Sequence, residues 1–475
     1  MTVIRGKLVE IVVILLSLFF LMFVAFRGFS VILFAPICAL FAVLLTEPGY
    51  VMPFYSGIFM DKMVGFIKSY FPVFLLGAIF GKLMEMSGFV KSITNSVIKV
   101  IGTSRAMLAI VLVGALLTYG GVSVYVVVFA IYPFAAELFK AADIPKRLIP
   151  ATIALGAFTF TMDALPGSPQ IQNIIPTSFF KTTTWAAPWL GVIGGLFVLS
   201  IGMLYLEWRR RRAKAAGEGY GSGHKNEPQP FSDEKLPNIF IAILPLIVVG
   251  VFNKIFTNLI PKFYGTQFDF TKIHIENVNA VDITKETSVW AVEGALLLGI
   301  LTVIVFSVKK IKTIKTNFNE GINVAIGGAL LATINTASEY GYGAIISMLP
   351  GFKSINQAMS NTFTNPLVNE AVTTTTLAGI TGSASGGMSI ALGAMSEIYL
   401  EQAQKFGIDP EVLHRVASMA SGGMDTLPHN GGIITLLVVT GLTHKQAYLD
   451  IFALTIIKTI SVFFIIGVYY LFGIV

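Results

Sequence analysis

Two aspartates stand at equivalent places in a repeated motif and could bind a cation or a proton. Asp163 is followed by Leu165-Pro166 and Asp425 by Leu427-Pro428, each inside a long apolar stretch. Proline removes one intrahelical hydrogen bond, so each motif predicts a broken helix. Half-helices that meet inside a membrane present N–H groups that suit a carboxylate and carbonyl groups that suit a cation. The pattern therefore predicts two helix breaks that bind a small anion together with its coupling ion.

Each motif also has a structural explanation that involves no ligand. A proline can simply kink a packing helix, and a carboxylate can cap the half-helix that follows it. Because both copies carry the acid at the same offset from proline, we favour the functional interpretation for Asp163 and Asp425 and keep capping as the alternative.

A second pair of motifs precedes the helix breaks and predicts two hairpin tips. Gly120-Gly121 is followed by Ser123, and Gly386-Gly387 by Ser389. Glycine permits a tight reversal and a close approach of backbone to ligand, and hydroxyl groups supply donors without a buried charge. Close helix packing through small residues is the alternative. Since the order of the motifs is the same in both halves, the chain is an internal duplication.

Charged residues inside predicted membrane segments are expensive and indicate function by default. His429 lies four residues after Asp425, and Gly167 occupies the matching place in the first copy. We interpret Asp163, Asp425, His429 and Glu339 as coupling-ion residues, with His429 and Asp425 as proton carriers; a position near the membrane interface is the alternative for Glu339. His414 and Arg415 are expected near the membrane interface, without a role.

The substrate-binding residues are predicted from the same motifs. Backbone N–H groups and hydroxyls near the breaks and tips would hold a carboxylate, while Gln170, Asn173 and Asn430 would bind a substrate hydroxyl. The predicted set is Gly120, Gly121, Ser123, Gly167, Ser168, Gln170, Asn173, Ser385, Gly386, Gly387, Ser389, Asn430 and Gly431.

Composition sets the class of protein. The 475 residues are 55% hydrophobic and 12% charged, and the mean hydropathy is +0.77, whereas a soluble chain has about a quarter of its residues charged. The recurring apolar runs predict an all-α polytopic membrane protein. The net charge of +7 comes from short basic loops, which indicate cytoplasmic segments rather than nucleic-acid binding. Cys38, the single cysteine, excludes an intrachain disulfide.

The expected layout is two inverted repeats of about five transmembrane helices, each with a re-entrant hairpin and a discontinuous helix. An odd number of crossings in each half gives the halves opposite orientations. The boundaries are 1–206 for the first repeat, with a hairpin at 106–139 and a broken helix at 148–181; 207–236 for a cytoplasmic linker; and 237–475 for the second repeat, with a hairpin at 367–400 and a broken helix at 411–444.

Basic residues predict the orientation. Placing Arg209–Lys214 in the cytoplasm also places Lys91–Arg105, Lys140–Arg147 and Lys309–Lys315 there, with both chain ends outside. Whether the segment Pro53–Lys68 crosses the membrane stays open at this point, and a crossing would move the ends to the other side.

The runs Asp163–Asn173 and Asp425–Gly432 resemble those of the gluconate permease family, within the ion-transporter superfamily. The run His429–Gly432 is more similar to the D-3-hydroxybutyrate permease branch. The resemblance covers nearly the whole chain. It implies a multi-pass carrier of the bacterial inner membrane for small organic anions, driven by protons, assembled as a homodimer and moving like an elevator.

We therefore expect a proton-coupled symporter of a short hydroxy-monocarboxylate such as D-3-hydroxybutyrate. The alternatives are a gluconate or other sugar-acid symporter and a sodium-coupled carboxylate symporter. No enzyme is predicted, because the Gly-x-Gly-Asp of aspartyl intramembrane proteases and the His-Glu-x-x-His zinc motif are both absent. A passive channel is a further alternative. No cofactor, metal or nucleic acid is expected; the partners are the anion, a proton or sodium ion, and the lipid bilayer.

Overall fold

The computed structural model describes residues 2–27, 29–102, 105–228, 236–275, 278–313, 315–352, 354 and 363–475. In these ranges the elements are helical apart from a short antiparallel pair of strands, β1 (Gln267–Phe268) and β2 (Val281–Asp282). Seven helices are long and apolar enough to cross a membrane by length and composition. The chain is thus an all-α polytopic membrane protein, as predicted.

The first half begins with two helices, a long composite run and an amphipathic helix. Its elements are α1 (Thr2–Phe26), α2 (Val31–Thr46), η1 (Pro48–Tyr50), α3 (Val51–Phe54), η2 (Tyr55–Phe59), α4 (Met60–Met86), α5 (Phe89–Ile101), α6 (Ala106–Tyr119), α7 (Val124–Ala141), η4 (Lys146–Leu148), α8 (Ile149–Ala157), α9 (Phe160–Asp163), α10 (Ile171–Phe180) and α11 (Pro188–Ala215). The segment Pro53–Lys68, which the sequence left open, belongs to the continuous helical run Pro48–Met86.

The second half repeats the same order of a hairpin followed by a broken helix. Its elements are α12 (Ile239–Tyr264), β1, η5 (Phe270–Ile273), β2, α13 (Ile283–Thr313), α14 (Lys315–Met348), α16 (Pro366–Thr381), α17 (Ala384–Phe406), α18 (Pro410–Gly422), η6 (Gly423–Thr426), α19 (Gly431–Thr440) and α20 (His444–Phe472).

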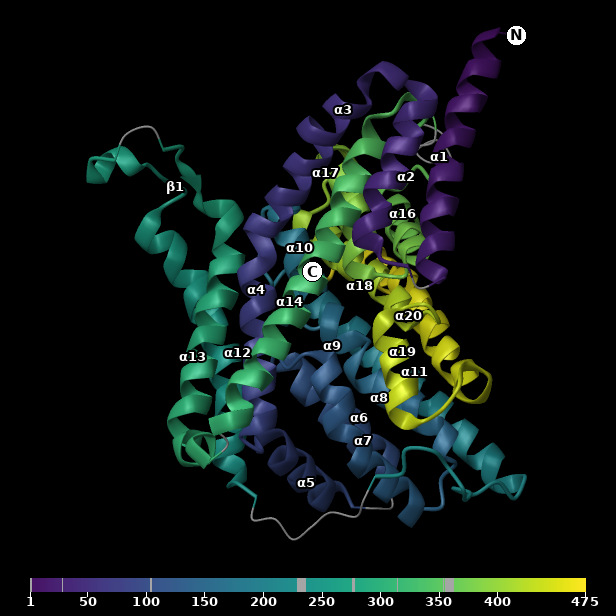
Figure 1. Cartoon of the computed structure of the whole chain (residues 1–475), viewed down its shortest axis with the longest axis vertical. Helices are drawn as coiled ribbons and strands as arrows, with labels where there is room; N and C mark the ends of the chain where they lie inside the picture. Colours follow the sequence, from purple (N-terminus) through teal and green to yellow (C-terminus); the bar gives the residue numbers. More distant parts are fainter. Residues whose placement is uncertain are drawn as a thin grey trace.

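The hairpins and broken helices pack in matching ways in the two halves. In hairpin 1 (α6–α7) the first arm lies on α8, and in hairpin 2 (α16–α17) the first arm lies on α18. The second arms cross over, so that α7 contacts α19 and α17 contacts α10. Hairpin 1 occupies the lower part of Figure 1 and hairpin 2 the upper part, as two inverted repeats require.

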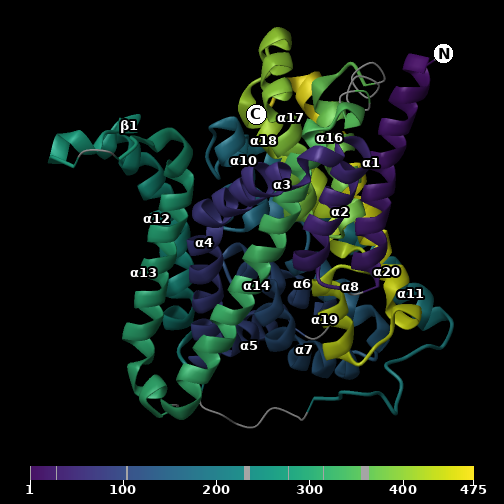
Figure 2. The same cartoon turned by 45° about the horizontal axis from the view of Figure 1, so that its top comes forward.

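The predicted basic segments gather at one end of the molecule. α5, the junction of α13 with α14 and the C-terminal end of α11 all lie at the bottom of Figure 1, while the N-terminus lies at the top, and Figure 2 keeps this arrangement. The helix α11 continues to Ala215, so the first part of the segment predicted as linker is helical. Its four arginines extend the apolar helix because they are good helix formers outside the membrane.

The remaining described part of the linker runs across this basic end, and we call Gly217–Glu227 the strap. Arg147 bonds Glu218 and also donates to the buried Asp450 of α20 at 2.9 Å. Asn226 donates to the Val438 carbonyl of α19 at 2.8 Å. The strap therefore connects the start of α8 with the ends of α19 and α20.

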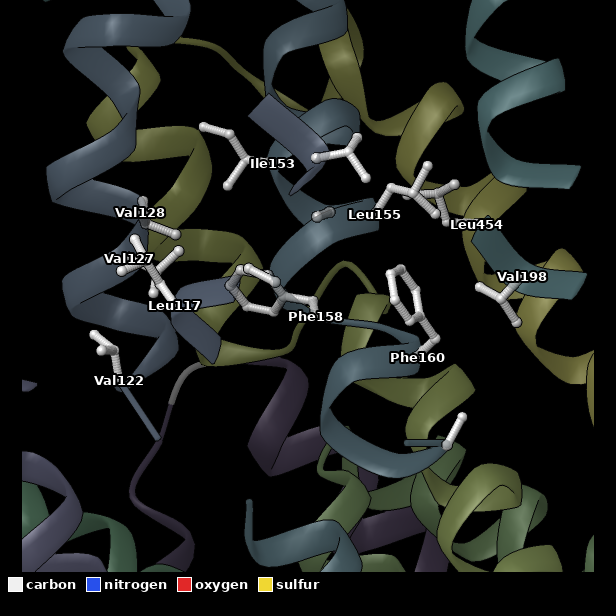
Figure 3. Close-up of a cluster of buried hydrophobic side chains, with 14 of the residues drawn as sticks. Leu117, Val122, Val127, Val128, Ile153, Leu155, Phe158, Phe160, Val198 and Leu454 are labelled. Carbon is white, nitrogen blue, oxygen red and sulfur yellow. The ribbon is translucent and has the colours of Figure 1, made fainter. Parts of the chain in front are cut away.

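Hydrophobic packing fixes the first helix break. Figure 3 shows Phe158 and Phe160 on either side of it, among side chains of hairpin 1, α8, α11 and α20. Both phenylalanines are at most 5% exposed. Next to them the Thr161 hydroxyl donates to the Gly156 carbonyl at 2.8 Å, which replaces a backbone bond where α8 has ended. The break is thus held by packing and by side-chain bonds.

A candidate transport site at two crossing helix breaks

Asp163 ends the first half of the broken helix in repeat 1 and is fully buried. One of its carboxylate oxygens accepts from the ammonium group of Lys458, which is also fully buried and lies in the middle of α20. Its backbone carbonyl accepts from Arg415 Nη1 at 2.7 Å and from the Ser418 hydroxyl at 2.9 Å. Repeat 2 therefore supplies both the counter-charge and the donors that hold break 1.

The loop after Asp163 is closed by hydrogen bonds within repeat 1. The Ser168 hydroxyl donates to the Thr161 carbonyl at 2.8 Å. The Asn173 amide donates to the carbonyls of Ser168 and Thr184 at 2.9 and 2.8 Å. Gly167 adopts a φ of +76° beneath the ring of Trp185, where any side chain would overlap the ring. The prolines and this glycine make the loop rigid.

Asp425 sits in the short η6 segment of break 2 and accepts from neutral donors. Gln172 Nε2 donates to one oxygen at 2.8 Å. The other oxygen accepts from the Ala384 N–H of the hairpin 2 tip at 3.2 Å and from Asn430 Nδ2 at 3.3 Å. Asn430 also caps α19 by accepting from Gly432 N and donates to the Gly382 carbonyl. One carboxylate thus joins the hairpin tip to both breaks.

The two breaks cross, so the predicted aspartates belong to one site. Besides the Gln172–Asp425 bond, the Ser418 hydroxyl contacts both the Asp163 and the Gln172 carbonyls at 2.9 Å. The second carboxylate oxygen of Asp163 lies against the backbone of Gly422, where a Cβ atom would overlap it. Residues separated by more than 250 positions in sequence therefore form a single polar centre.

Three residues of this centre, Arg415, His414 and Lys458, were not predicted as site residues. Arg415 is fully buried, and besides Asp163 its guanidinium donates to Asn173 Oδ1 at 3.0 Å and to the Ala186 carbonyl at 2.6 Å. His414, also fully buried, bridges Thr182 and Asn173. The expectation of an interfacial position was wrong for both. Lys458 has a clear sequence signal, a lysine within a predicted apolar span.

The hairpin tips contact the breaks of their own repeats. In repeat 1, Gln170 donates to the Thr118 carbonyl at 2.7 Å, and Gly121, at a φ of +93°, faces Pro169. In repeat 2, the imidazole of His429 lies against Gly382. Glu339 of α14 lies behind this tip, with its carboxylate against Gly386. His429 and Glu339, which were both predicted as coupling-ion residues, therefore touch hairpin 2.

Several predicted substrate donors already have partners in this conformation. The N–H groups of Gly121, Gly167 and Gly387 donate to the carbonyls of Thr118, Thr184 and Ser383 at 2.8–3.0 Å. The hydroxyls of Ser168 and Ser389 donate to main-chain carbonyls. Ser385 lies 3.3–3.4 Å from the hydroxyls of Ser383 and Thr336. Gly120 is enclosed by Leu246. These residues shape the site in this state.

The accessible part of the predicted set lies where hairpin 1 meets break 2. Gly431 is exposed at the first residue of α19, and a Cβ atom there would be 3.5 Å from the hydroxyl of Tyr125. Ser123, Gln170 and Asn430 are each half-buried. We call Gly431, Ser123, Gln170, Asn430 and the neighbouring Tyr125 the accessible rim. It borders the Asp425 centre through Asn430, which donates to that carboxylate.

The described residues contain no group of three or more His, Cys, Asp or Glu side chains that could hold a metal ion. Inverted repeats, two hairpins and two crossing helix breaks with buried charges define the class of polytopic membrane transporters. The chain is 61% identical over 474 residues, 98% of its length, to the whole of an uncharacterized transporter of Bacillus subtilis, YxjC. The chain belongs to the same transporter family as that protein.

A solved structure supports the fold. The Alcanivorax borkumensis YdaH transporter, described as having an unusual topology, aligns with 90% of this chain and 90% of its own at a TM-score of 0.55 and 14% identity. No family model matches the chain. The protein is thus a multi-pass membrane transporter, and the bacterial source of its relative agrees with the predicted inner-membrane location.

Proposed function

We propose that the protein is a secondary active transporter that moves a short hydroxy-monocarboxylate together with a proton. The observation that carries the proposal is the contrast of partners at the crossing breaks. Asp163 faces a buried lysine, whereas Asp425 accepts only neutral donors among the described residues. A carboxylate without a cationic partner in a buried site is readily neutralised by a proton.

The charges of the centre support the binding of one proton there together with each anion. Lys458 and Arg415 supply two positive charges, and Asp163 and Asp425, when ionised, supply two negative ones. A substrate carboxylate adds a negative charge that the buried centre cannot hold without compensation. A proton on Asp425, delivered through His429, restores neutrality, so anion and proton bind together and leave together.

The accessible rim gives the substrate neutral hydrogen-bonding groups. Exposed Gly431 lies at the N-terminus of the ten-residue helix α19, where backbone N–H groups and the helix dipole favour a carboxylate. The side-chain amides of Gln170 and Asn430 can bind a hydroxyl group of the substrate. The resemblance of the His429–Gly432 run supports D-3-hydroxybutyrate as the first substrate to test, with gluconate second.

Sodium is the alternative coupling ion. The Asp163 oxygen that lacks a hydrogen-bond partner among the described residues, together with main-chain carbonyls of the breaks, offers the oxygen ligands of a sodium site. Assembly as a homodimer with an elevator-like movement remains part of the proposal and rests on the family resemblance.

The test is uptake of labelled D-3-hydroxybutyrate into proteoliposomes with an imposed proton gradient and no sodium. Concentrative uptake that an uncoupler abolishes is the expected result. Uptake of gluconate alone would change the substrate and keep the mechanism. Uptake that requires sodium in either case would overturn proton coupling, and a flux far above carrier turnover rates would identify a channel.

A further inference from the structure

A buried carboxyl group lies outside the crossing breaks, in the first arm of hairpin 2. Glu370 is 0% exposed, and neither of its carboxyl oxygens has a hydrogen-bond partner among the described residues. Thr374, one helical turn further along the same face, is also fully buried, and its hydroxyl likewise has no partner there. Two unsatisfied polar groups therefore face the same protein interior.

The described residues of the elements around Glu370 bring no ion partner to it. The arm α16 packs against α1, α17, α18, α20 and η6. Among the described residues, the ionisable side chains of these elements lie at the surface (Glu397, His444, Lys445), are acidic like Glu370 (half-buried Glu10) or are bonded elsewhere: Tyr399 to Asn369, Glu411 to Ala187, His414 and Arg415 to Asn173, Lys458 to Asp163, Asp425 to Gln172, Asp450 to Arg209 and Glu401 to Lys405. An ionised carboxylate in such surroundings costs several kcal/mol. Glu370 is therefore neutral and holds a proton.

The first repeat shows that hairpin packing does not require this acid. The equivalent arm α6 has no polar side chain between Ala106 and Leu117, and it still packs on α8 as α16 packs on α18. α16, in contrast, carries Asn369, Glu370 and four consecutive threonines, Thr373–Thr376. The polar groups of hairpin 2 are thus an addition to a fold that is complete without them.

Glu370 is also remote from the crossing breaks. It lies twelve residues before Gly382 at the tip, which corresponds to about 18 Å along an α-helix. The proton that compensates the substrate at Asp425 is therefore a different one.

We propose that Glu370, with Thr374 beside it, is a second proton-carrying site, so that two protons accompany each monovalent anion and transport moves one net positive charge. This inference rests on the proposed proton symport. The carboxylate takes up one proton from the outer side and, as the carboxylic acid, releases the same proton inside after hairpin 2 has moved. No other bond is made or broken.

The experiment measures uptake at fixed proton gradient while the membrane potential is varied with potassium and valinomycin. With one net charge per cycle, the accumulation ratio of the wild-type protein should rise about tenfold for each ~59 mV of inside-negative potential. Glu370→Gln, which mimics the neutral acid and keeps the fold, should still accumulate substrate with the proton gradient but should lose the response to potential. Glu370→Asp should keep it.

Glu401→Gln is the matched control, because Glu401 is exposed on the other arm of the same hairpin and pairs with Lys405. Wild-type uptake that ignores the potential, or a Glu370→Gln protein that responds as the wild type does, would overturn the second proton site and leave the symport intact.

Infrared spectroscopy tests the protonation of Glu370 even if neither substrate is transported. The infrared band of a protonated carboxyl group should be present in the purified wild-type protein at neutral pH and weaker in Glu370→Gln. An unchanged band would show that Glu370 is ionised and would overturn the inference without any transport assay.

Discussion

The two helix breaks share a motif but solve the problem of a buried acid differently. Asp163 in break 1 is matched by Lys458, and its carbonyl is held by Arg415. Asp425 in break 2 receives hydrogen bonds from amides, one of which belongs to the hairpin 2 tip. Ten residues before each aspartate the first repeat has Ile153 where the second has Arg415. A duplicated scaffold has thus acquired one charge-paired break and one neutral break.

The difference separates two tasks that the motif could serve. A buried ion pair resists protonation and fixes the geometry, because removing one partner leaves an uncompensated charge. A carboxylate with neutral donors can gain or lose a proton without leaving another charge unpaired. In the proposed mechanism, break 1 is therefore the static side of the site, and break 2 is the side that gains and loses a proton.

The largest effect is expected when the ion pair between Asp163 and Lys458 is removed. Asp163→Asn leaves Lys458 as an unpaired buried cation and should destabilise the protein by about 3–5 kcal/mol. Asp425→Asn keeps one acceptor oxygen, which can serve the two donors on Oδ1 but not Gln172 on Oδ2, and should cost only about 1 kcal/mol. Thermal unfolding of the detergent-solubilised proteins measures both.

The double variant Asp163→Asn with Lys458→Met is the control for this prediction, because it removes both charges and should recover most of the lost stability. Equal losses for the two single asparagine variants would show that the ion pair does not distinguish the breaks.

The second prediction concerns coupling rather than stability. Asp425→Asn should lower the concentrative uptake driven by a proton gradient to the level that the proton proposed at Glu370 alone can drive, because the amide cannot take up the compensating proton. Exchange of labelled for unlabelled substrate should persist, since the rim still binds the anion. Concentrative uptake at the wild-type level in this variant would place the coupling proton elsewhere.

His429 is a further difference between the two breaks, because Gly167 occupies the equivalent position in break 1. His429→Gln should abolish the pH dependence of uptake between pH 5 and 8, the range in which histidine titrates. His274→Gln in the exposed loop after η5 is the matched control. Uptake with the wild-type pH profile after His429→Gln would remove the histidine from the coupling path.

The smallest effect is expected at the strap, which holds the far end of break 2 through α19. The hydrogen bond from Arg147 lowers the pKa of Glu218 below its ordinary value of 4.5. A lowered pKa means that the pair stabilises the protein above pH 4.5 and that this contribution is lost as the pH falls through the lowered pKa. Because Glu218 is largely exposed, the contribution is about 0.2–1 kcal/mol.

The protection of the strap amides against hydrogen exchange, after correction for the pH dependence of the intrinsic exchange rate, should accordingly fall at acidic pH, and Glu218→Gln should show the lower protection already at neutral pH. Exchange that is the same in Glu218→Gln and in the wild type would mean that the Arg147 pair does not hold the strap.

The repeated motifs were sufficient to predict the fold. Gly-Gly-x-Ser and Asp-x-Leu-Pro in the same order predicted hairpins and breaks, because glycine and proline act on the local backbone. The partners across the site could not be predicted in this way. Gln172 meets Asp425, and Lys458 meets Asp163, only because the two breaks cross, and a contact between residues far apart in sequence leaves no local pattern.

Predicted donors differed from the structure for a related reason. The N–H group of Gly167 was expected to face a ligand, but in this conformation it donates to the carbonyl of Thr184, a residue beyond α10. The glycine signal correctly indicated an unusual backbone at a φ of +76°. It could not tell whether that backbone serves a ligand or a neighbouring segment of the same chain.

Trp185 lies against Gly167 in break 1, with the Lys254 ammonium 4.6 Å from the centre of its ring. Indole emission depends on nearby charge and on solvent, so this side chain is a built-in fluorescent reporter. The protein has four tryptophans. With Trp189, Trp208 and Trp290 replaced by phenylalanine, the emission of Trp185 would report in real time, and without a chemical label, whether the loop after Asp163 stays fixed while substrate is transported.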